Sequence, residues 1–163
     1  MLGSSVEPRV SPEVPEPTSQ WREGSFRRIL VAFDGSEKSW SALRMGISLA
    51  WQHDAELWAL SVEEDLPRLP VTVGEVEEEK EWEDKHYGEL HDQARKLAMQ
   101  RGVRLHSAVR PGRAVATIVH CARQGGFDLI IIGGNGRGWL WDALLGTSSR
   151  VTRGAPCHVM VVR

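Results

Sequence analysis

The alternation of short apolar runs with segments of helical periodicity constrains the fold of this chain more than any other feature. Residues 29–33 and 128–132 indicate strands that are apolar on both faces, as in the centre of a parallel sheet. After the first run, Ser36 can cap a helix in which Trp40, Leu43, Ile47 and Ala50 share one face. A strand followed by an amphipathic helix is the repeating unit that the rest of the chain continues.

The remaining elements complete a βαβαβαβαβ order. Strands are predicted at 56–62, 103–109 and 157–162, and helices at about 75–100, around 115–122 and at 147–153. Strands that alternate with helices form a parallel sheet through right-handed crossovers, with helices on both faces. We therefore predict an α/β fold, doubly wound, with five strands.

Composition excludes several classes of protein. The 163 residues suffice for one domain with a core, and 20 basic against 22 acidic residues argue against binding nucleic acid by charge alone. Two cysteines without a CxxC pair exclude a disulfide scaffold and fit a reducing cytoplasm. The apolar runs are too short to span a bilayer, and no signal peptide is readable, so a cytoplasmic protein without membrane contact is expected.

The first 25 residues differ from the rest in composition. They contain four of the eight prolines and five serines, and their apolar residues follow no period. Such a segment cannot bury enough surface to offset its ordering entropy. We predict a disordered tail at 1–25 and a folded domain at 26–163.

A glycine-rich segment at 133–149 follows the fourth strand and leads into a helix. Glycines let backbone N–H groups approach a ligand, and the helix that begins at Thr147 adds free N–H groups and the positive end of its dipole. Gly146, Thr147 and Ser148 are therefore expected to bind phosphate. Walker A is excluded because Trp139 stands where that motif has lysine, and the dinucleotide fingerprint belongs after the first strand.

The spacing Gly133-x2-Gly136-x9-Gly146-Thr147 resembles the nucleotide motif of the ATP-binding universal stress proteins. The resemblance covers 27–163 and includes the opening segment 29–36 and the closing segment 155–162. It implies a parallel sheet in the order 3-2-1-4-5 and a site for ATP, accompanied by Mg²⁺ if a metal is bound. Trp139 and Trp141 depart from the usual spacer. They are interpreted as loop anchors, with a role in covering the nucleotide or in a partner surface as the alternative.

The resemblance also assigns the site residues. Asp34 and Ala32 would face the nucleoside, Val62 would meet adenine through its main chain, and Gly133 would lie by the ribose. The phosphates would be bound by four residues: Gly136, Gly146, Thr147 and Ser148. Since the first and fourth strands are neighbours at the chain reversal, Asp34 and Gly133 are expected to be close.

Catalysis is not indicated, because the sequence has no nucleophile elbow and no histidine pair with metal-ligand spacing. The main hypothesis is a nucleotide-dependent stress or regulatory protein that hydrolyses ATP slowly at most. The alternative is an interaction module of the same fold that binds no nucleotide. The last strand has both faces apolar and no proline or charge in its interior, which predicts a homodimer through that edge.

Overall fold

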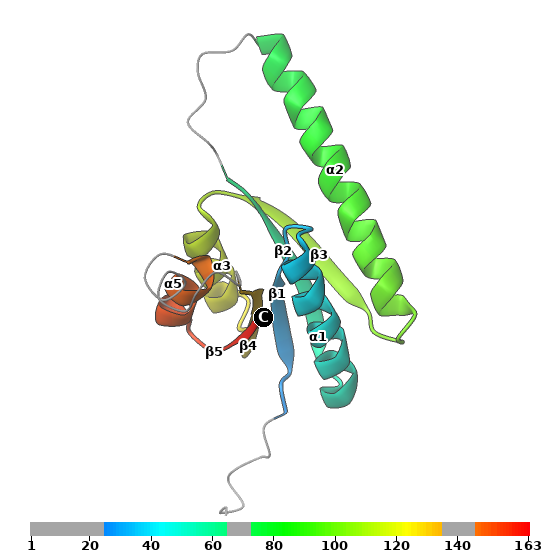
Figure 1. Cartoon of the computed structure of the whole chain (residues 1–163), viewed down its shortest axis with the longest axis vertical. Helices are drawn as coiled ribbons and strands as arrows, with labels where there is room; N and C mark the ends of the chain where they lie inside the picture. The colour runs from blue at the N-terminus through cyan, green and yellow to red at the C-terminus, as the bar shows by residue number, and fades with distance from the viewer. Residues whose placement is uncertain (1–24, 65–72, 135–145) are drawn as a thin grey trace, which may run out of the picture.

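The computed structural model describes residues 25–64, 73–134 and 146–163. Five strands and four helices alternate along these residues (Figure 1). They are β1 (Arg28–Ala32), α1 (Glu37–His53), β2 (Glu56–Glu63), α2 (Val73–Met99), β3 (Leu105–Pro111), α3 (Ala114–Gln124), β4 (Leu129–Gly133), α5 (Thr147–Gly154) and β5 (His158–Val162).

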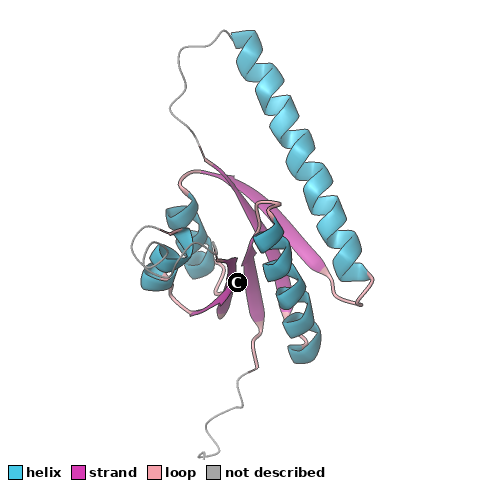
Figure 2. Cartoon of the chain, in the orientation of Figure 1, coloured by secondary structure: helices cyan, strands magenta, loops and turns pink. Residues whose placement is uncertain are grey.

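The strands form one sheet in the order β3-β2-β1-β4-β5, and all neighbouring strands are parallel. This confirms the predicted fold class and strand order. Helices cover both faces of the sheet (Figure 2), with α1 and α2 on one face and α3 and α5 on the other. The direction in which strands are added to the sheet reverses between β1 and β4. Because these two strands are parallel neighbours, their carboxyl ends lie side by side.

The core has one apolar layer on each face of the sheet. Ile29, Val31 and Ile131 point toward α1, while Leu30 and Ile130 point toward α3. Each strand of the central pair is buried from both sides, which explains its unbroken apolar sequence. Gly46 allows α1 to approach closely, because a Cβ there would lie 2.8 Å from a methyl group of Val31.

The third strand was predicted at 103–109, and both of its boundaries are wrong by two residues, since β3 begins at Leu105 and ends at Pro111. Gly102 adopts a left-handed φ of 71°, its N–H bonds to the Met99 carbonyl, and the Val103 N–H bonds to the Ala98 carbonyl. Val103 therefore completes a Schellman turn at the end of α2 instead of starting a strand.

Among the described helices, none has the length and apolar content needed to cross a membrane.

Candidate functional site

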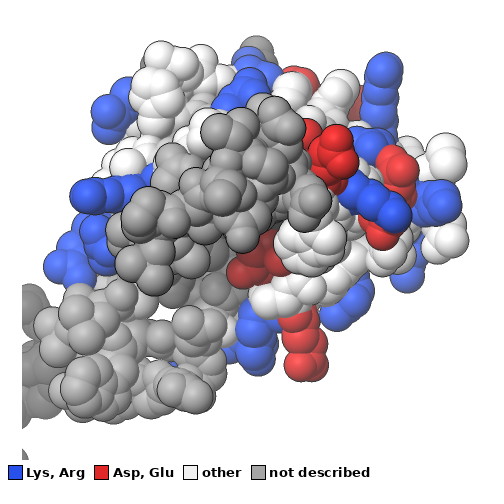
Figure 3. Space-filling view, turned by 90° about the horizontal axis from the view of Figure 1, so that it is seen from above, with Lys and Arg blue, Asp and Glu red and all other residues white. Residues whose placement is uncertain are grey.

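A cleft of about 410 Å³ opens at the carboxyl end of the sheet. Main-chain segments from the ends of β1, β2 and β4 line it, together with the first turns of α1, α3 and α5. Five of the eight predicted site residues line this cleft: Ala32, Asp34, Val62, Gly133 and Thr147. Figure 3 looks onto the molecule from above, where acidic side chains lie beside the grey atoms and basic side chains are spread around the rim.

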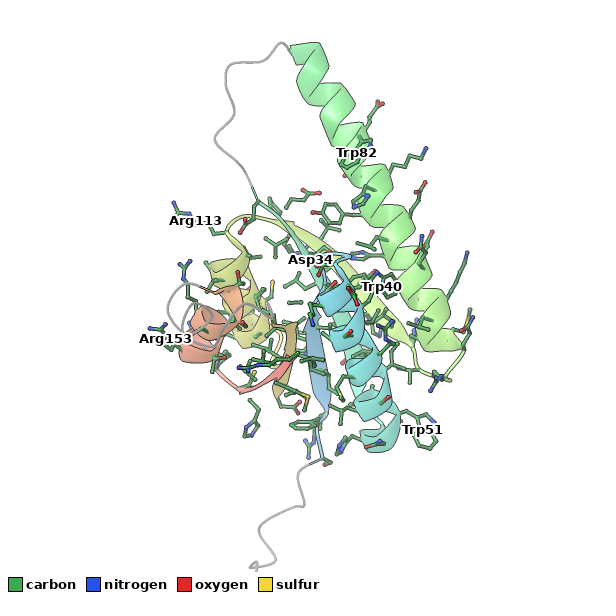
Figure 4. All side chains as sticks on the ribbon, viewed as in Figure 1. Asp34, Trp40, Trp51, Trp82, Arg113 and Arg153 are labelled. Atoms are coloured by element: carbon green, nitrogen blue, oxygen red, sulfur yellow. The ribbon has the colours of Figure 1, made fainter. Side chains whose placement is uncertain are left out.

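Asp34 follows β1 and lies in the cleft at the start of α1 (Figure 4). Its Oδ1 accepts a hydrogen bond of 2.9 Å from the Ser36 N–H, and the Ser36 hydroxyl in turn caps α1 by accepting from the Ser39 N–H. Desolvation raises the pKa of Asp34, but hydrogen bonds from Ser36 and Ser39 outweigh it and hold the pKa below its ordinary value. The side chain is exposed and anionic at neutral pH, so it can accept hydrogen bonds from a ligand.

Gly133 ends β4 against the first turn of α1. A Cβ at this position would lie 2.7 Å from the carbonyl carbon of Lys38 and 2.8 Å from its oxygen. These atoms belong to main chain, so they cannot move aside like the end of a flexible side chain. Glycine is therefore required for the close approach of β4 and α1 that forms this wall of the cleft.

Substituting Gly133 by alanine is expected to lower the free energy of unfolding by about 1–3 kcal/mol, because the new methyl group overpacks this contact. Thermal unfolding measures the loss, at about 2–4 °C per kcal/mol for a chain of this length. Gly88 on α2 offers a matched control, since a Cβ there meets no atom within 4 Å. Gly88→Ala is expected to stabilise the helix by about 1 kcal/mol. Equal melting temperatures for Gly133→Ala and the parent would contradict the packing account.

The amino end of α5 faces the cleft through Thr147. Gly146 is the N-cap residue with extended backbone (φ −71°, ψ 144°), and as a glycine it has no side chain with which to cap the helix. The first N–H groups of a helix have no carbonyl partner within the helix, so this end offers donors and a partial positive charge. The Ser148 side chain is not available to a ligand, because the residue is 7% exposed and does not line the cleft. Only its main-chain N–H counts among the donors at this helix end.

Several predicted features lie outside the described residues, among them the tail predicted at 1–25, of which only residue 25 is described. The others belong to the glycine-rich segment. They are Gly136 of the glycine motif and both spacer tryptophans, Trp139 and Trp141.

The cleft residues that the sequence reasoning missed include Lys38, Glu64 and Tyr87. Glu64 follows β2, and its Oε1 accepts a 2.9 Å hydrogen bond from the Ala114 N–H at the start of α3. Glu64 could have been predicted from its position two residues after Val62, because residues that directly follow a parallel strand lie at the edge of the sheet where ligands bind. Tyr87 comes from α2, and no motif distinguishes it in the sequence.

A second cavity of about 780 Å³ lies on the α3 face of β2 and β3. Trp58, Ala108 and Phe127 line it, and the His106 ring stacks on Trp58 at 4.9 Å. This cavity is larger but contains neither Asp34 nor the first turn of α5. Within the described residues, no group of three or more His, Cys, Asp or Glu side chains is placed to hold a metal ion.

Comparisons with known proteins agree on one family. The model of the universal stress protein family matches residues 25–163. The chain is 31% identical over 143 residues to universal stress protein MJ0531 of Methanocaldococcus jannaschii, covering 86% of this chain and 84% of that protein. It also resembles the solved structure of UspA from Lactobacillus plantarum, with 28% identity, a TM-score of 0.74 and coverage of 86% and 99%.

Two more distant structures with this fold were solved with nucleotides. One is a universal stress protein in complex with cAMP, at 20% identity and a TM-score of 0.67, covering 86% of this chain and 98% of that one. The other is a family member from Arabidopsis thaliana with AMP bound, at 14% identity and a TM-score of 0.63, covering 83% and 90%. At these identities the likeness shows the fold alone.

Proposed function

Because the chain belongs to the universal stress protein family, we propose that its cleft binds an adenine nucleotide, with ATP as the expected ligand. The observation that carries the proposal is the pairing, in one cleft, of an anionic carboxylate with the amino end of a helix whose N-cap residue is glycine. A carboxylate accepts hydrogen bonds from sugar hydroxyls but repels phosphate, whereas a helix amino end attracts phosphate. The cleft therefore orients a nucleotide with its ribose at Asp34 and its phosphates at Gly146, Thr147 and the Ser148 main chain.

The other site assignments follow from this orientation. Ala32 and the main chain of Val62 lie at the ends of adjacent strands and would contact the nucleoside, and Gly133 would lie by the ribose. Gly136 would add a phosphate contact, as the motif implies. Mg²⁺ is proposed only as a companion of ATP, bound mainly through phosphate oxygens. The relatives solved with cAMP and AMP support an adenine nucleotide as the ligand class.

We infer a regulatory role in a cytoplasmic protein, in which bound nucleotide changes interactions with partners and hydrolysis is slow at most. The alternative is an interaction module of the same fold that binds no nucleotide. Two measurements separate them: identification of any nucleotide released from the purified protein by denaturation, and calorimetric titration of nucleotide-free protein with ATP, AMP and cAMP. Saturable binding at one site per chain supports the proposal, and absence of heat with all three nucleotides favours the interaction module.

We also propose a homodimer in which β5 pairs with the same strand of a second copy. β5 lies at the edge of the sheet, and Val161 is 38% exposed there. The unpaired backbone groups of such an edge can be satisfied by antiparallel pairing across a two-fold axis.

Val161→Lys is expected to convert the dimer to a monomer, since a charged side chain would be buried at the two-fold contact. Light scattering after size exclusion should give twice the chain mass of 18.2 kDa for the parent and 18.2 kDa for the variant. Met99→Lys is a suitable control because Met99 is 73% exposed at the end of α2. A parent that elutes as a monomer, or a variant that stays dimeric, would contradict this interface.

A further inference from the structure

A buried polar chain joins α2 to the edge of the sheet that carries the cleft. His91 of α2 is 4% exposed and Ser61 of β2 is 1% exposed. The His91 Nε2 lies 2.8 Å from the Ser61 Oγ, which lies 2.5 Å from the main-chain oxygen of Phe33. These contacts link α2, β2 and the residue that follows β1.

The chemistry of the three groups fixes the direction of both hydrogen bonds. A carbonyl oxygen only accepts, so the Ser61 hydroxyl donates its proton to Phe33. The Ser61 oxygen then accepts from His91, which must carry its proton on Nε2. Burial lowers the pKa of His91, as does nearby Arg95, against a smaller opposite effect of Asp92. The ring is therefore neutral at pH 7.

The hydrogen-bonded chain of His91, Ser61 and Phe33 ends at the cleft, which Phe33 also lines. Phe33 precedes Asp34 and Ser61 precedes Val62, so the two bridged residues adjoin two residues of the cleft lining. The Phe33 N–H also bonds to the Leu60 carbonyl at 2.9 Å, which closes the pairing of the strand ends. One turn before His91, Tyr87 lines the cleft from α2.

Ring contacts hold the same arrangement from the side. The His91 ring stacks on the Phe33 ring, with 6.2 Å between their centroids. Trp40 of α1 contacts the same Phe33 ring edge-on, with 4.9 Å between the centroids. Figure 4 shows Trp40 and Asp34 near the upper end of α1, beside the sheet. Movement of His91 would therefore be transmitted to Phe33 and to the Asp34 main chain.

We propose that His91 is a positioning residue of the cleft, which acts through Ser61 to fix the strand ends that carry Asp34 and Val62. The effect on ligand affinity rests on the proposed nucleotide function, whereas the effect on the strand ends does not. His91 makes no contact with the ligand in this account. It acts through the proton on Nε2, which it donates to Ser61.

The matched pair His91→Gln and His91→Asn tests the position of that proton. The glutamine amide reaches about as far as Nε2, while the shorter asparagine amide reaches only to the place of Nδ1. By calorimetry, His91→Asn and Ser61→Ala should each weaken nucleotide binding about 3- to 10-fold, the effect of one hydrogen bond. The affinity of His91→Gln should stay within about 2-fold of that of the parent. The Ser61→Ala/His91→Asn double variant should bind nucleotide at most about 2-fold more weakly than either single variant.

A purely structural role would give a different pattern. The loss of affinity in His91→Gln and His91→Asn would then parallel the loss of melting temperature in each variant. The fold-loss of affinity in the double variant would equal the product of the two single fold-losses. His120→Asn, on the exposed face of α3, is the control and should bind nucleotide like the parent. Equal affinity of His91→Asn and the parent would overturn the proposal.

Amide spectra separate this inference from the proposed function. In nucleotide-free protein, His91→Asn and Ser61→Ala should shift the backbone amide signals of Asp34 and Val62, and His91→Gln should leave them near their parent positions. If these signals do not move, the positioning role is wrong whether or not nucleotide binds. If they move but the parent binds no nucleotide, the proposed function alone fails.

The pH dependence gives a further readout. Protonation adds a second N–H to a buried ring whose neighbouring ionisable groups are Tyr87, Asp92 and Arg95, all on α2. The unfolded chain takes up this proton near pH 6.5, while the folded protein resists it until lower pH. The parent should therefore lose stability as pH falls below about 6.5, and His91→Gln should lose less. An identical pH profile of the two proteins between pH 7 and 5 would count against the assignment.

Discussion

Gly146→Val is expected to abolish ATP binding while leaving the fold intact. The backbone at Gly146 is extended, with φ −71° and ψ 144°, which valine adopts without strain. Its side chain would occupy the approach to the first N–H groups of α5. Loss of two charge-assisted hydrogen bonds, at about 1.5–3 kcal/mol each, predicts a loss of affinity of at least about 100-fold in calorimetry.

The same variant should discriminate between ligands. Adenosine has no phosphate, so its affinity should be nearly the same for Gly146→Val and the parent, whereas ATP and AMP should bind more weakly. Gly154→Ala at the other end of α5 is the control, because a Cβ there makes only ordinary contacts with Val119. If Gly146→Val binds ATP as tightly as the parent, the phosphates do not lie at the amino end of α5.

Asp34→Ala is expected to weaken adenosine, AMP and ATP alike, by about 10- to 100-fold. The reason is that the carboxylate is assigned to the ribose, which all three ligands share, and a hydrogen bond to a charged group contributes about 1.5–3 kcal/mol. The pattern is thus opposite to that of Gly146→Val, which spares adenosine. Calorimetric titration of the two variants with the same three ligands separates the ribose end of the cleft from its phosphate end.

Asp34→Asn is the companion variant for this prediction. Its amide oxygen can still accept from the Ser36 N–H, so the turn into α1 should persist. The negative charge is lost, so ribose binding should fall by less than in Asp34→Ala, while repulsion of phosphate is also reduced. A loss in Asp34→Ala that is confined to ATP would show that the carboxylate does not face the ribose.

The sheet could be predicted because its central strands are apolar on both faces and its helices have clear apolar stripes. The order of β1 and β4 followed from the resemblance and placed Asp34 and Gly133 in one cleft, as the structure confirms. The start of β3 could not be predicted, because Val103 alternates like a strand residue but its N–H closes the turn after α2.

Part of the candidate site could not be predicted from the sequence, for a different reason. His91 follows Tyr87 and precedes Ala94 and Ala98 on the inner face of α2, at helical spacing, so its burial was readable in principle. Its partners were not, because Ser61 and Phe33 meet it only through the tertiary packing of α2 on the sheet. Likewise, the steric need for glycine at 133 depends on the Lys38 main chain, which is distant in sequence.

The most direct test of the proposed function is to map ATP onto the backbone amides of the parent protein by two-dimensional NMR. The account predicts that the largest shifts occur at Asp34, Val62, Gly133 and Thr147, around the smaller cleft. The larger cavity near Trp58, Ala108 and Cys121 should be unaffected. Shifts that cluster around that larger cavity, or no saturable shifts at all, would contradict the assignment of the cleft as an adenine nucleotide site.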